Sequence, residues 1–83
     1  MFLDQVDINW PCRVSGVSTP QGASQIKGQL EDIGFLPGEQ VTLLRKGLLG
    51  RGPYMVRVGA STFALRQSEA CMIEVECEHN VWI

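Results

Sequence analysis

Residues 30–44 read LEDIGFLPGEQVTLL, a run that passes from a helical pattern through two glycines and a proline into a strand pattern. Before it, Ile26, Leu30 and Ile33 are spaced by four and three residues, which places all three on one face of a helix. Ser24 is the expected N-cap, because its hydroxyl can accept a hydrogen bond from a free amide of the first turn. The run therefore predicts a short helix followed closely by a strand.

The glycines and the proline are predicted to form a structural turn. We expect Gly34 to end the helix, because glycine enters the left-handed conformation without a Cβ clash. Phe35 should then lie over Leu30, the apolar contact that usually accompanies such a helix end. Pro37 and Gly38 suit the centre of a type II turn, since proline presets φ and glycine accepts a positive φ. Gly34, Pro37 and Gly38 would thus hold a helix against a sheet.

Alternation of apolar and other residues predicts five short strands. In the second of them, Val41 and Leu43 should face inward. A single helical turn is expected at 68–70. Five strands with closely spaced turns and one short helix predict a mainly β fold, a small partly open barrel that forms one domain over residues 1–83. We expect a short C-terminal extension from about residue 77, and place the strands at residues 12–17, 41–46, 54–58, 62–66 and 73–76.

Composition argues against two classes of function. The net charge is −2 and the pI is about 5.2, and the only basic cluster is Arg45, Lys46 and Arg51, so nonspecific nucleic-acid binding is disfavoured. No apolar run approaches the ~20 residues of a membrane helix. The N-terminal stretch MFLDQVDINW carries acids where a signal peptide carries positive charge, so we expect a cytoplasmic protein.

The three cysteines show no CxxC spacing, which argues against a disulfide framework and against a tetrathiolate zinc site. Cys12 and Cys71 lie in apolar-alternating runs and are expected to be buried free thiols.

The C-terminal residues offer a candidate metal site. Cys77 and His79 are two residues apart, so their side chains would share a face of a continuing strand, with Glu76 and Glu78 beside them. Such ligands suit zinc or another divalent metal ion, although no cofactor is expected to be required. One chain supplies too few ligands to close such a site, so we expect the metal ion to bridge two copies of the chain in a homodimer. The alternative is a solvated tail.

The glycine-rich loop GLLGRGP at 47–53 lacks the lysine and Ser/Thr of a phosphate loop. Its two leucines, Leu48 and Leu49, either fold back over the barrel end or form an apolar patch for a partner. We expect a partner-binding face formed by Leu36, Leu48 and Leu49, with Arg51 at its edge. An enzyme is not expected, because the single histidine has no fixed nucleophile beside it.

Three stretches, LEDIGFLPGEQVTLL, GLLGRGPYMVRV and FALRQSEACMIEV, occur in an order that resembles the FeoA family, small cytosolic proteins of bacterial ferrous-iron uptake. The resemblance covers about residues 11–76. It implies an SH3-like β-barrel and a role as accessory to FeoB, a membrane transporter with a cytosolic GTP-binding domain. The sequence departs from the family pattern in the segment STPQGASQIKGQ, in the loop LLGRGP and in the ending CEHNVWI.

Two other functions stay open. The chain is also similar to the C-terminal regulatory domain of iron-dependent DtxR-type repressors, although it has no DNA-binding helices of its own. It could alternatively carry or sense a divalent metal through its C-terminal residues.

Overall fold

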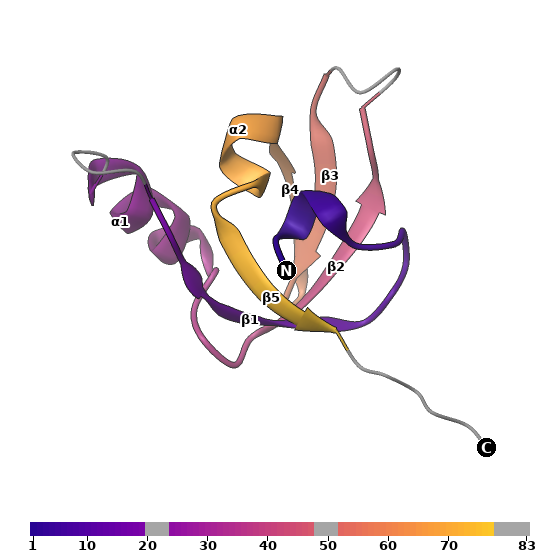
Figure 1. The fold of residues 1–83 in the computed structure, drawn as a ribbon, viewed down its shortest axis with the longest axis horizontal. Coiled ribbons are helices and arrows are strands. Elements are labelled where there is room, and N and C mark those ends of the chain that lie inside the picture. Colours follow the sequence, from indigo (N-terminus) through magenta and orange to yellow (C-terminus); the bar gives the residue numbers. More distant parts are fainter. Residues whose placement is uncertain (20–23, 48–51, 78–83) are drawn as a thin grey trace.

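The computed structural model describes residues 1–19, 24–47 and 52–77, and the described strands form one curled antiparallel sheet (Figure 1). The strands lie in the order β4-β3-β2-β1-β5, so β4 and β5 are the edges. Their bounds are β1 Cys12–Val17, β2 Gln40–Arg45, β3 Tyr54–Val58, β4 Ser61–Leu65 and β5 Ile73–Cys77. The helical elements are η1 Leu3–Gln5, α1 Ser24–Ile33 and α2 Gln67–Ala70.

The predicted mainly β fold with five strands is confirmed, and every strand lies within two residues of its expected bounds. Alternation fixes the inward faces: Val41 and Leu43 are fully buried, as the pattern predicts. The pairing of β1 with β5 shifts register between Val14 and Gly16. None of the described helices has the length and apolar character needed to span a bilayer.

The N-terminal segment contributes to the core in a way that the sequence analysis did not predict. Leu3 and Val6 are buried against the sheet, and the amide of Phe2 donates a 2.8 Å hydrogen bond to Gln5 Oε1. The carbonyl of Met1 accepts a 2.8 Å hydrogen bond from the amide of Val75. The segment therefore covers part of the free edge of β5, a place where an unpaired strand would otherwise be exposed.

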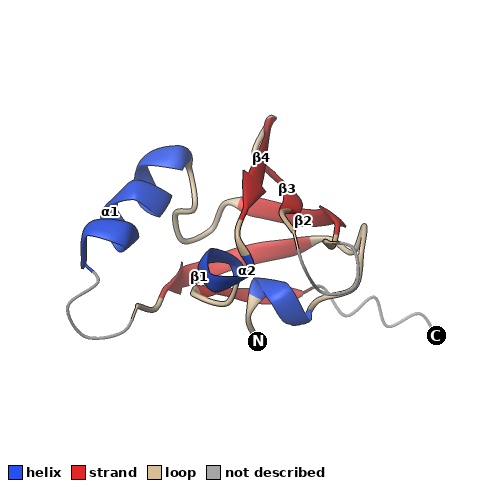
Figure 2. Ribbon diagram, turned by 90° about the horizontal axis from the view of Figure 1, so that it is seen from above, coloured by secondary structure: helices blue, strands red, loops and turns tan. Residues whose placement is uncertain are grey.

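Helix α1 stands to one side of the sheet in both ribbon views (Figures 1 and 2). Leu30 is buried in the core and Ile26 packs partly against it, as expected. Ile33 was expected on the same inward face, and this prediction is wrong: its side chain is 37% exposed. The helix ends at Ile33, and Phe35 occupies the core position beyond the turn, so the buried face continues without Ile33.

The expectation of a buried free thiol at Cys12 is also wrong, because Cys12 forms a disulfide with Cys77 across 65 residues. The two residues are paired directly opposite each other at the end of the β1–β5 ladder. Spacing rules address ligands and motifs that lie close in sequence, whereas this pair is created by strand register. Cys71 is a free thiol, as predicted, but it is exposed and not buried.

Candidate functional site

The end of α1 has the hydrogen bonds of a Schellman motif. Gly34 adopts φ +130°, and its amide donates to the carbonyl of Glu31 at 3.1 Å. The amide of Phe35 donates to the carbonyl of Leu30, also at 3.1 Å. Phe35 and Leu30 are both buried in the same core cluster. The predicted helix end at Gly34 is therefore confirmed in conformation and in contacts.

The turn that follows is anchored to the neighbouring strand. Gly38 adopts φ +92°, and the amide of Glu39 donates to the carbonyl of Leu36 at 3.0 Å, which is the type II turn expected here. The Gly38 amide donates to the carbonyl of Val14 at 2.8 Å, and Arg13 Nη1 donates to the carbonyl of Gly38 at 2.9 Å. Sequence reasoning missed Arg13, because a contact across 25 residues leaves no local signal.

These restraints hold apolar side chains in solvent. Ile33 is 37% exposed and Leu36 is 45% exposed, and the neighbouring Pro37 is exposed as well. We call Ile33, Leu36 and Pro37 the junction surface. Asp32 and Glu39 are exposed beside these residues in the chain. Arg13, whose guanidinium donates to the carbonyl of Gly38, adds a cation beside them, so the edge of this surface carries both signs of charge.

The remaining predicted partner-binding residues, Leu48, Leu49 and Arg51, lie outside the described residues. Leu36 precedes the start of β2 at Gln40, and these three residues follow the end of β2 at Arg45 in the sequence. Of the predicted partner-binding residues, only Leu36 is therefore among those that the structure describes.

The predicted metal ligands fall on either side of the described boundary. Cys77 is bonded to Cys12 and cannot act as a thiolate ligand in this state, and His79 lies outside the described residues. Over residues 1–19, 24–47 and 52–77, no group of three or more His, Cys, Asp or Glu side chains is arranged to hold a metal ion.

Comparisons with known proteins agree with the fold. The family model of the FeoA domain matches residues 1–77. The crystal structure of FeoA from Stenotrophomonas maltophilia complexed with zinc is 34% identical over 92% of this chain and 89% of that one, with a TM-score of 0.81. It is described as an SH3 domain protein and suggested to be a ferrous iron transport activating factor.

Two solution structures are similar too. A FeoA-like protein from Clostridium acetobutylicum is 27% identical over 99% of this chain and 93% of that one, with a TM-score of 0.78. Iron(II) transport protein A from Clostridium thermocellum is 28% identical over 93% of this chain and 45% of that one, with a TM-score of 0.76. No curated protein sequence gives a significant match.

Proposed function

Because this chain belongs to the FeoA family, which is associated with ferrous iron transport, we propose that it is a cytoplasmic accessory protein that binds the cytosolic GTP-binding region of a FeoB-type transporter. The suggestion made for the Stenotrophomonas maltophilia protein, a transport activating factor, supports a regulatory role of this kind. In this proposal the protein acts by contact, as a non-enzymatic module.

The observation that carries the proposal is the junction surface. Ile33 and Leu36 are apolar, partly exposed and held by a backbone with a Schellman end and an anchored turn. A rigid side chain loses little conformational entropy when it binds, so more of the free energy gained by its burial contributes to affinity. Binding energy at interfaces also concentrates in a few such side chains.

Magnitudes indicate that the junction surface does not act alone. Burying the exposed parts of Ile33 and Leu36 contributes about 1 kcal/mol each. A micromolar complex requires about 8 kcal/mol in total. We therefore include Leu48, Leu49 and Arg51 in the proposed interface, as a second contact.

Titration of the purified cytosolic region of the transporter with this protein tests the proposal. Saturable binding is expected, and Leu48→Ser/Leu49→Ser should weaken it on the order of tenfold, because two apolar contacts are lost. Thermal unfolding of the variant serves as the control for the fold. Absence of binding by the wild-type protein would contradict the proposed partner, whereas normal binding by the variant would remove only the loop from the interface.

A second proposal concerns zinc, because the Stenotrophomonas maltophilia protein was crystallised with it. Cys77 and His79 remain the candidate ligands on this chain. Cys77 can bind zinc only after the disulfide is reduced, so the proposed zinc binding should require a reductant.

A further inference from the structure

The Cys12–Cys77 disulfide joins two sulfurs in different surroundings. Cys12 is 1% exposed, whereas Cys77 is partly exposed at the end of β5. Two hollows open on Cys77, one of about 220 Å³ and one of about 370 Å³. The first is lined by Met1, Gln5, Val6, Asp7, Trp10 and Cys77, and the second by Met1, Val75, Glu76 and Cys77. A nucleophile can therefore approach the disulfide from the side of Cys77.

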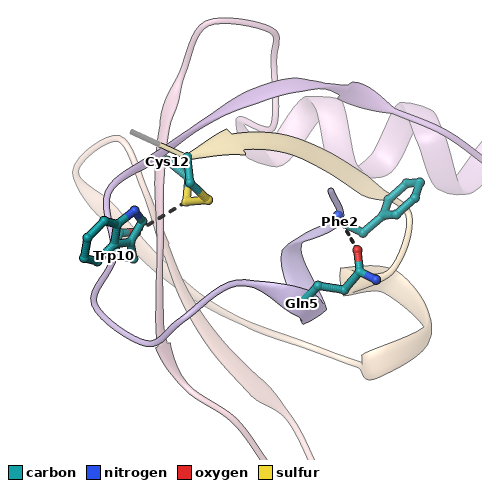
Figure 3. The surroundings of a disulfide bond; sticks show 5 residues. Phe2, Gln5, Trp10 and Cys12 are labelled. Carbon is teal, nitrogen blue, oxygen red and sulfur yellow. Dashed lines mark hydrogen bonds between the residues drawn. A yellow bond between two sulfur atoms is a disulfide. The ribbon is translucent and has the colours of Figure 1, made fainter. Parts of the chain in front are cut away.

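The environment of Cys12 suits the reduced state. Its Sγ lies 3.5 Å from the carbonyl oxygen of Trp10, as Figure 3 shows. A cysteine donates a hydrogen bond only as a thiol, so this contact becomes a hydrogen bond when the disulfide is broken and Cys12 is protonated. The carbonyl thus provides an acceptor for the thiol that reduction releases.

We propose that the Cys12–Cys77 disulfide is a site of thiol–disulfide exchange, reduced by a cellular thiol that attacks Cys77. The inference rests on the proposed cytoplasmic location, because disulfides of cytosolic proteins are usually transient or redox-sensing. The entering thiolate bonds to Sγ of Cys77, and the bond to Cys12 breaks. The electron pair leaves on Sγ of Cys12, which takes a proton from water.

A second thiolate of the reductant then completes the exchange. It attacks the reductant's own sulfur in the mixed disulfide and releases Cys77 as a thiolate, which is protonated in turn. Two electrons and two protons reach the protein, and the reductant becomes a disulfide. The reverse reaction requires a disulfide of the same class as the oxidant.

Strand β1 connects this site to the junction surface. Cys12 pairs with Val41 as well as with Cys77, and the described pairing of β1 with β2 comprises only the pairs Cys12–Val41 and Arg13–Gln40. The next residue, Val14, exchanges backbone hydrogen bonds with the turn, donating to Glu39 at 2.9 Å and accepting from Gly38 at 2.8 Å. Reduction removes the covalent restraint on this strand and loosens the turn that presents Leu36.

The first experiment maps the attacked sulfur in protein that carries Cys71→Ser, which removes the exposed third thiol. The air-oxidised protein should weigh two hydrogen atoms less than the protein treated with dithiothreitol. Incubation with excess reduced glutathione, followed by an acid quench and peptide mapping, should give an adduct on Cys77. A parallel arm with thioredoxin distinguishes a protein dithiol from the tripeptide. An adduct on Cys12, or absence of the disulfide, would overturn the proposal.

Two single-cysteine variants provide a kinetic test on the same background. In Cys12→Ser the thiol of Cys77 should react with glutathione disulfide on the order of tenfold faster than the thiol of Cys12 does in Cys77→Ser, because only Cys77 is accessible. Equal rates would contradict the assigned direction of attack. Peptide mapping of the disulfide-bonded protein decides the question even when a variant does not fold.

Hydrogen exchange tests the connection to the junction. In the reduced protein the amides of Val14 and Gly38 should exchange faster than in the oxidised protein and faster than the amide of Val56, whose exchange in the core reports global unfolding. Equal protection of Val14 and Gly38 in both redox states would overturn the link. No transporter fragment is present in these experiments, so their outcome is independent of the proposed binding function.

Discussion

Gly34 has a backbone conformation that side chains with a Cβ rarely adopt. Its φ is +130°, while a Cβ placed there would meet only Val58 methyl carbons at 3.7 and 3.9 Å, which is ordinary contact. The cost of replacing Gly34 therefore comes from backbone strain and not from a clash.

We predict that Gly34→Val lowers the free energy of unfolding by more than about 1 kcal/mol, since a β-branched residue resists a positive φ. Gly28→Ala is the matched control on the same helix. A methyl group added at Gly28 would have no neighbouring atom within 4 Å, so this variant should be neutral or stabilise by up to about 1 kcal/mol. Denaturant midpoints measure both effects, and an unchanged midpoint for Gly34→Val would contradict the role given to this turn.

At the scale of elements, the strands and the junction could be predicted because their signals are local. Alternation marked the strands, and Gly34, Pro37 and Gly38 marked the helix end and the turn through their own conformational preferences. The support that Arg13 gives to this turn depends on strand register, which local patterns do not encode. The exposure of Ile33 depends on where the chain turns away, and helical periodicity alone could not show it.

The burial of the N-terminal segment could not be predicted from local sequence patterns either. Leu3 and Val6 are three residues apart, a spacing that indicates one buried face, but so short a segment gives a weak periodic signal. We predict that Leu3→Ala destabilises the protein by about 2–5 kcal/mol, because Leu3 is fully buried in the core. Ile8→Ala is the control: Ile8 is 46% exposed and its truncation should change stability by less than about 0.5 kcal/mol. Similar midpoints for the two variants would show that this segment is not part of the folded core.

At the scale of the whole molecule, the disulfide ties the first strand to the last. Closing a loop of 65 residues stabilises the fold by about 4 kcal/mol in the chain-entropy model. For a small domain this is a large part of the total stability. The redox state of the disulfide therefore affects measurements of stability and binding. Variants should be compared with wild type when all samples are fully oxidised, or when all are fully reduced.

The proposed zinc binding depends on whether the Cys12–Cys77 disulfide is oxidised or reduced. We predict that zinc produces a dimer only after reduction, because Cys77 must be a thiolate and the ligands of one chain are incomplete. The dimer should dissociate with chelator and in His79→Ala, which removes one of the proposed ligands. Sedimentation of reduced and oxidised protein measures this. A monomer in every reduced sample with zinc would leave the C-terminal residues without a metal role.

The central claim is that the junction surface binds the transporter, and its most direct test is the affinity of a variant that lacks only these apolar groups. Ile33→Ser/Leu36→Ser should weaken binding to the transporter's cytosolic region on the order of tenfold or more, a loss of about 1.4 kcal/mol or more. Both side chains are exposed, so the unfolding midpoint should stay close to wild type. Ile8→Ser, outside the junction surface, is the matched control and should bind as wild type does. Wild-type affinity in a folded Ile33→Ser/Leu36→Ser protein would contradict the account.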